Sequence, residues 1–137
     1  MSLSMHAALV PGITHTLEAL SAVLGKAAAH CEARKIDPQA LADHLNALDS
    51  PHHQAPAALS LTNSTEYGTV YSTAEARTLI DLAKAKGVGV HLDGARLANA
   101  VASGFDPKAI AGLGVDVLVL GGTKAGMSPT EALVVFN

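Results

Sequence analysis

Two short apolar runs, each preceded by segments of helical character, restrict the folds open to this chain. They are VGVHL at 88–92 and DVLVLGG at 116–122. A parallel strand can return to its sheet only by a long connection, so strands that alternate with helices predict parallel pairing with crossover helices. In both runs, the residues that would point to either face of the sheet are mostly apolar, which is typical of a sheet covered on both faces. The sequence therefore predicts an α/β fold, a three-layer sandwich with a mostly parallel sheet.

Capping residues place two of the helices. Asp37 and Pro38 have the order of an N-cap and a first helical residue, and they predict a helix from there to about residue 48. Ser72 and Glu75 have the spacing of a capping box, which predicts a helix that ends at a left-handed Gly87. The other expected elements are helices over 14–34, 95–103 and 106–114, strands over 57–63 and 131–137, and loops over 50–56, 64–72 and 123–129.

Composition excludes several classes of protein. With 137 residues, 49% hydrophobic content and a net charge of -3, residues 1–137 are expected to form a single α/β domain with its own core. The chain has only 3% aromatic residues and no stripe of Lys and Arg, so we expect no nucleic-acid partner. No apolar run reaches the roughly 18 residues that span a bilayer, so we expect no membrane partner. The single cysteine, Cys31, excludes an intramolecular disulfide and favours a cytoplasmic protein.

Neither a metal site nor a nucleotide loop is expected. The chain has seven histidines, but His52 and His53 are adjacent and face opposite ways in any regular structure. No second cysteine or carboxylate cluster completes a set of metal ligands. The segment GGTKAG at 121–126 lacks the spacing of a Walker-type phosphate loop.

Charged residues follow both apolar runs. Asp93 and Arg96 come after the first run, and Lys124 comes after the second. In open α/β sheets ligands bind beyond the carboxyl ends of the strands, so these side chains are candidates for one site. Simpler interpretations remain open: Asp93 as a helix N-cap paired with Arg96, and Lys124 as a solvated residue in a glycine-rich turn.

A strand-end aspartate and a lysine in a small-residue turn suit pyridoxal phosphate chemistry. The carboxylate of Asp93 would keep the pyridine nitrogen protonated, and the amine of Lys124 would hold the aldehyde as a Schiff base. The neighbours of Lys124 are small and would let a flat cofactor approach the backbone: Gly121, Gly122, Ala125 and Gly126.

These motifs resemble a known family. GVGVHLDGARLANA at 87–100 and GVDVLVLGGTKAGMSPTEALVVFN at 114–137 resemble the central part of low-specificity L-threonine aldolases, which belong to the β-eliminating lyase group of fold type I pyridoxal phosphate enzymes. LTNSTEYGTVYS at 61–72 also resembles the segment before the crossover helix of that family. The resemblance covers 57–137, with a weaker likeness over 14–38, and implies part of the large domain of such an enzyme.

The resemblance also implies roles for four residues. Lys124 would be the Schiff-base lysine, Asp93 the partner of the pyridine nitrogen, and Arg96 a residue that holds the cofactor or the substrate carboxylate. Thr123 could offer its hydroxyl to the cofactor phosphate. The implied reaction is cleavage of threonine or a related β-hydroxy-α-amino acid, a small-molecule substrate, to glycine and an aldehyde. Fold type I sites are commonly built between subunits, so a homo-oligomer is expected.

The chain also departs from the family. Members are usually well over twice as long, with a small-residue phosphate loop and a later, smaller domain that are not evident here. His15 is a candidate for the histidine that stacks on the cofactor ring. The alternative is a truncated or degenerate relative that keeps the fold without catalysis.

Four loop residues allow two interpretations each. Tyr67 and Tyr71 could border the site or pack the loop against the sheet. Asn63 and Glu66 could contact a ligand or form hydrogen bonds within the loop.

Overall fold

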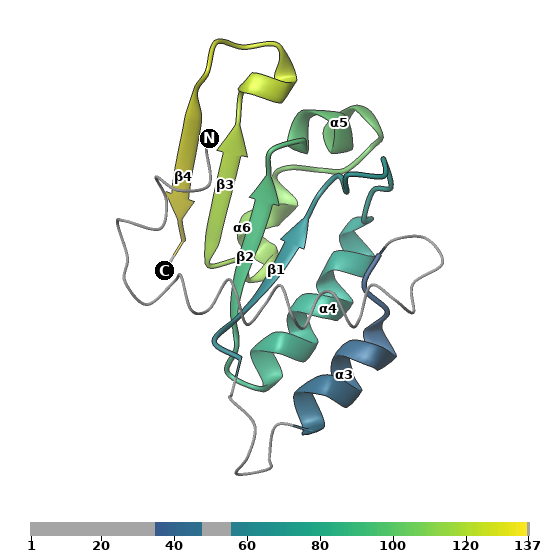
Figure 1. Cartoon of the computed structure of the whole chain (residues 1–137). Helices are drawn as coiled ribbons and strands as arrows, with labels where there is room; N and C mark the ends of the chain where they lie inside the picture. Colours follow the sequence, from purple (N-terminus) through teal and green to yellow (C-terminus); the bar gives the residue numbers. More distant parts are fainter. Residues whose placement is uncertain (1–34, 48–55, 137) are drawn as a thin grey trace.

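A computed structural model of the chain describes residues 35–47 and 56–136 (Figure 1). The elements are α3 (Pro38–Ala47), β1 (Ala58–Thr62), α4 (Thr73–Ala85), β2 (Gly89–Gly94), α5 (Leu97–Ala102), α6 (Ala109–Leu113), β3 (Val117–Gly121), the short 3-10 helix η1 (Thr123–Ala125) and β4 (Glu131–Val135). The helix predicted over 14–34 lies outside the described residues, as do His15, Cys31, His52 and His53.

The strands form one sheet in the order β1-β2-β3-β4. Strands β1, β2 and β3 are parallel, and β4 runs antiparallel to β3 (Figure 1). This arrangement confirms the predicted mostly parallel sheet. Asp93 on β2 pairs with Thr62 on β1 and with Val119 on β3, so it lies in the middle of the parallel part.

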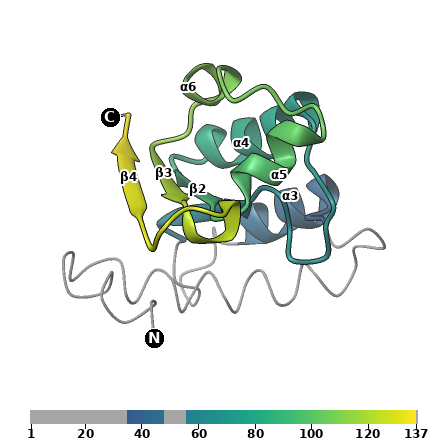
Figure 2. The ribbon, with the colours of Figure 1, turned by 90° about the horizontal axis from the view of Figure 1, so that it is seen from above.

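Helices α4, α5 and α6 cover one face of the sheet, and α3 packs against α4 (Figure 2). Alternate strand residues point into this layer and are buried there: Leu59, Leu61, Val90, Leu92 and Leu118. Complete burial of one such side chain stabilises the fold by about 1.5–3 kcal/mol. Helices and sheet supply two of the three predicted layers within the described residues, while the single-domain organisation of 1–137 stays a prediction.

Local hydrogen bonds explain where the two capped helices begin. The Ser72 hydroxyl accepts from the Glu75 N–H over 3.2 Å, and the Ser72 N–H donates to Glu75 Oε2 over 2.7 Å, which together form the predicted capping box. Gly87 follows α4 with φ 70°, in the predicted left-handed conformation. Asp37 Oδ1 accepts from the Ala40 N–H over 2.8 Å, which confirms the predicted N-cap of α3.

Several predicted boundaries were wrong; helix α5, for example, begins at Leu97 and not at Ala95. Strand β2 continues two residues past the predicted end of the apolar run 88–92, because pairing with β1 and β3 keeps the backbone extended through Asp93. Helix α6 begins at Ala109 and not at Asp106, because Asp106 Oδ1 accepts from the Lys108 N–H over 2.9 Å and forms a turn there.

Candidate active site

The carboxyl ends of β2 and β3 adjoin at one edge of the sheet. Asp93 pairs with Val119, and beyond this pair the two backbones are in close contact. A Cβ atom on Gly121 would lie only 3.0 Å from the Ala95 Cα atom. The segments that carry Asp93 and Lys124 therefore leave the sheet side by side (Figure 1).

Asp93 lies on the sheet face opposite to α4, α5 and α6. Its neighbour Leu92 is buried beneath those helices, and successive strand residues point to opposite faces. Asp93 is half-buried, and its Oδ1 accepts from the Ala95 N–H over 2.8 Å. Its second carboxylate oxygen accepts no hydrogen bond from any described residue, and can therefore accept one from a ligand. The helix-cap interpretation was wrong, because the N-cap position of α5 is Arg96 and no side chain caps that helix.

Arg96 follows β2 and points to a loop that is distant in sequence. Its Nη2 lies 3.3 Å from Oε1 of Glu66, in the loop after β1. Within the described residues it makes no ion pair with Asp93, so the predicted alternative of that pair was also wrong. Arg96 therefore links the loops that follow two adjacent strands.

Thr123 and Lys124 lie in η1, immediately beyond β3. Both residues are exposed, and the Lys124 amine has no hydrogen bond or ion pair with any other described residue. Gly122 holds the turn closed, since its N–H donates to the Thr130 carbonyl oxygen over 2.8 Å. The turn presents an open amine at the edge where β2 also ends, and the roles of both residues stay predictions.

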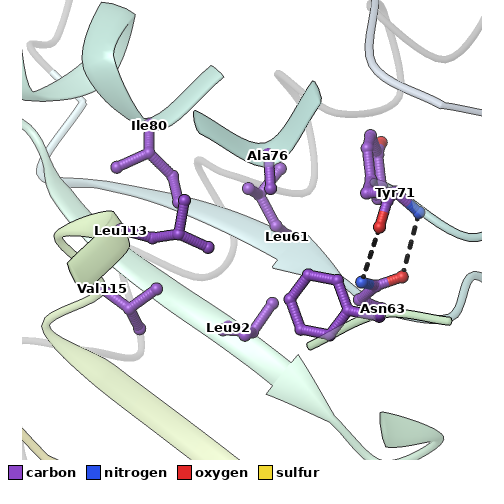
Figure 3. A pocket seen from close by; sticks show the side chains of 9 residues that line it. Leu61, Asn63, Tyr71, Ala76, Ile80, Leu92, Leu113 and Val115 are labelled. Atoms are coloured by element: carbon purple, nitrogen blue, oxygen red, sulfur yellow. Dashed lines mark hydrogen bonds between the residues drawn. The ribbon is translucent and has the colours of Figure 1, made fainter. Parts of the chain in front are cut away.

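Asn63 anchors the loop after β1. Its N–H donates to the Asp93 carbonyl oxygen over 3.1 Å, and its buried side-chain amide bonds both backbone groups of Tyr71 (Figure 3). The buried Tyr71 hydroxyl accepts from the Ile36 N–H over 2.7 Å. The packing interpretation is thus confirmed for Tyr71 and the loop hydrogen-bonding interpretation for Asn63, while Tyr67 is exposed at the loop tip.

The sequence interpretation gave no role to His91. Its Nδ1 lies 2.8 Å from the Ser60 hydroxyl, and it shares a sheet face with Asp93 because the two are separated by one residue. Burial lowers the pKa of His91, and the negative charge of Asp93 opposes this effect. One sequence feature could have revealed that His91 lies beside the candidate site. It is the only polar residue of an apolar run, two positions before Asp93.

A small cavity lies between α4 and the sheet, and no charged residue lines it (Figure 3). Its volume is about 10 Å³, room for one water molecule at most. Its walls are mainly apolar core side chains, and the Asn63 amide among them is already bonded to Tyr71. The cavity is a packing void and not a ligand site.

Within 35–47 and 56–136, no cluster of three or more His, Cys, Asp or Glu side chains could hold a metal ion. In the same part of the chain no helix is long and apolar enough to cross a membrane.

The open, mostly parallel sheet places the chain among the open-sheet α/β folds, whose ligands, where they occur, bind beyond the carboxyl ends of the strands. The model of the Beta-eliminating lyase family matches residues 11–137, and the chain belongs to this family.

Curated relatives and a solved structure agree with the predicted resemblance. The chain is 39% identical to a low specificity L-threonine aldolase of Pseudomonas aeruginosa over 111 residues, which are 80% of this chain and 32% of that protein. It is 35% identical to the enzyme of the same name from a Pseudomonas species, with the same coverage. A structure of Leishmania major threonine aldolase matches 78% of this chain and 32% of its own, with a TM-score of 0.71 and 34% identity. This chain thus spans about a third of the length of these relatives.

Proposed function

We propose that this chain carries the cofactor-binding centre of a pyridoxal 5'-phosphate-dependent carbon-carbon lyase. The reaction is cleavage of threonine or a related β-hydroxy-α-amino acid to glycine and an aldehyde. The observation that carries the proposal is the location of Asp93 and Lys124 at the adjoining carboxyl ends of β2 and β3. The 39% identity to a low specificity L-threonine aldolase supports this choice of reaction.

The described residues fit the cofactor. When bound, pyridoxal phosphate supplies a ring that accepts the electrons left by cleavage of the Cα–Cβ bond. Asp93 offers a half-buried carboxylate with one oxygen open to a protonated ring nitrogen, and a charge-assisted hydrogen bond there keeps the proton in place. Lys124 offers an amine that is open to bond the aldehyde covalently.

Arg96 and Thr123 would hold the anionic groups of the ligands. The planar guanidinium of Arg96 matches a carboxylate, and the residue follows directly on the strand that carries Asp93. The hydroxyl of Thr123 is exposed beside Lys124 and could donate to the cofactor phosphate. His15, the candidate for ring stacking, lies outside the described residues.

Chemical trapping tests the lysine assignment. The 137-residue chain is incubated with pyridoxal phosphate, reduced with borohydride and digested, and the labelled peptide is identified by mass spectrometry. We expect the label on Lys124 and its loss in Lys124→Ala. Lys108→Ala is the matched control, because it removes another exposed lysine, away from this strand edge. If Lys124→Ala is labelled as fully as the parent, the assignment is wrong.

The alternative is a relative that keeps the fold without catalysis. The chain spans about a third of the length of the curated relatives, so their activity is proposed for it and not shown. Aldehyde release from threonine distinguishes the lyase from the inactive relative. It is measured with pyridoxal phosphate, before borohydride is added, on protein that the trapping experiment has shown to be labelled. We also expect a cytoplasmic homo-oligomer, and full activity in a protein whose solution mass is that of a monomer would contradict the oligomer.

A further inference from the structure

Arg96 is already paired with a carboxylate of this chain. The pair is a single contact, from Nη2 to Glu66 Oε1 over 3.3 Å. It lacks the two short parallel hydrogen bonds of a strong arginine–carboxylate pair. The Glu66 side chain is 74% exposed, whereas that of Arg96 is 24% exposed. The arginine is held against the protein, and its partner stands in solvent.

The loop that carries Glu66 is fixed at its base and exposed at its tip. The Thr65 N–H donates to the Thr69 carbonyl oxygen over 2.9 Å, and the Thr69 N–H donates to the Thr65 hydroxyl over 3.1 Å. Residues 66–68 between them are exposed. A rotation of the Glu66 side chain can therefore release Arg96 without breaking the hydrogen bonds at the base of the loop.

We propose that Glu66 is an internal competitor for the substrate carboxylate. It neutralises Arg96 when no amino acid is bound, and the α-carboxylate of the substrate displaces it by forming two hydrogen bonds in place of one long contact. This inference rests on the proposed function, in which Arg96 faces that carboxylate.

The competition gives Glu66 a role in affinity. A ligand with a planar carboxylate can displace Glu66, whereas a neutral or purely cationic analogue has no carboxylate to exchange for it. An exposed ion pair contributes little stability, so the cost of displacing Glu66 is small for the correct ligand. The pair therefore lowers the affinity for amino acids slightly, whereas the corresponding amines and amides leave it in place.

Binding to Arg96 can be followed without any catalytic readout. Arginine side-chain Nε–Hε resonances of the full 137-residue chain, without cofactor, are recorded by NMR as glycine is added, with Arg96→Gln used to identify the Arg96 resonance. We expect that resonance to shift and saturate with glycine, and to stay in place with glycinamide. In Glu66→Gln the apparent dissociation constant for glycine should fall about two- to fivefold, the range expected for loss of a competing exposed ion pair.

Asp81→Asn is the matched control. It removes the same charge from another exposed arginine pair, since Asp81 Oδ1 lies 3.9 Å from Arg77 Nη1 on α4, and it should leave the glycine affinity unchanged. Equal or weaker glycine binding in Glu66→Gln, or an Arg96 resonance that ignores glycine, would overturn the inference. Borohydride labelling of Lys124 on a separate sample distinguishes the failures. A labelled lysine with an unresponsive Arg96 rejects only the competition, whereas an unlabelled Lys124 rejects the proposed function.

Discussion

The N–H of Asn63 donates to the carbonyl oxygen of Asp93 over 3.1 Å, which ties the loop after β1 to the strand end that carries the proposed cofactor carboxylate. The same asparagine uses its side chain to bond the backbone N–H and carbonyl oxygen of Tyr71. One buried residue therefore fixes both ends of the loop 63–71. Glu66, which contacts Arg96, stands on this loop.

Asn63→Ala should be strongly destabilising. The substitution leaves two backbone groups of Tyr71 without their partner, and Asn63 is only 1% exposed, so water cannot easily replace it. We expect a loss of about 2–4 kcal/mol in the free energy of unfolding, measured by urea denaturation. Asn99→Ala, at an exposed position on α5, is the control and should change little. Equal losses in the two variants would show that the Asn63 amide does not hold the loop.

Gly94→Ala should separate β2 from β3. A Cβ atom there would lie 2.7 Å from the Val119 carbonyl oxygen, and a strand backbone cannot yield without breaking its pairing. We expect a loss of about 1–3 kcal/mol, seen as a lower melting temperature. Gly112→Ala is the matched control, because no atom lies within 4 Å of its added Cβ and its φ is ordinary. That change in α6 should be neutral or stabilising. A Gly94→Ala protein as stable as Gly112→Ala would refute the steric argument.

Glu75 should make the protein sensitive to acid. The hydrogen bond from Lys35 and then that from the Ser72 backbone lower the pKa of Glu75 from 4.5 to about 2. Because the folded pKa is the lower one, the stabilisation is present above pH 4.5 and is lost as the pH falls towards 2. The side chain is 48% exposed, so solvent screening reduces the effect to about 1 kcal/mol.

Glu75→Gln isolates this effect, because glutamine can keep the capping box but cannot form the ion pair with Lys35. In urea unfolding, the parent should have the higher free energy of unfolding at pH 6. The difference between parent and variant should be smaller at pH 3. A constant difference between the two proteins would contradict the predicted linkage.

Protonation of His91 should destabilise the fold at a higher pH than protonation of Glu75 does. Burial lowers its pKa from 6.5 in spite of Asp93, so the unfolded chain binds a proton before the folded chain does. The free energy of unfolding is therefore not reduced by His91 above pH 6.5, and it decreases as the pH falls below that value. In His91→Gln the urea midpoint should depend less on pH between 7.5 and 5.5 than it does in the parent. His44→Gln, on α3, is the matched histidine substitution. If the parent and His91→Gln follow the same curve, His91 does not titrate in this way.

The features that were predictable from the sequence are those set by neighbouring residues. The limits of α4 follow from Ser72 and Glu75 at its beginning and from Gly87 at its end. Each of these signals lies within a few residues of the boundary that it sets. The parallel order of β1, β2 and β3 follows from alternation of strands with helices, and it brings the ends that carry Asp93 and Lys124 to one edge.

The features that were not predictable depend on contacts between distant segments. Asp93 belongs to β2 only because β1 and β3 extend the pairing, and neither partner is visible in the local pattern. The partner of Arg96 is Glu66, 30 residues earlier, although the sequence offered Asp93 three residues away. Nearness in sequence favours Asp93 as the partner, but the parallel order of β1 and β2 places the loop with Glu66 beside Arg96.

Asp93→Asn tests the charge that the proposed function requires. Asparagine keeps the shape of the side chain and can still accept from the Ala95 N–H, so the strand end should remain intact. An amide cannot balance a positive charge on the cofactor ring, and we expect aldehyde release from threonine to fall by about 100- to 1,000-fold, as for other lost preorganised charges. Borohydride labelling of Lys124 should persist, because the amine is unchanged. Asp106→Asn, at an exposed turn before α6, is the control and should keep both properties. Undiminished aldehyde release in Asp93→Asn would show that this carboxylate does not act on the ring nitrogen, even if Lys124 still carries the label.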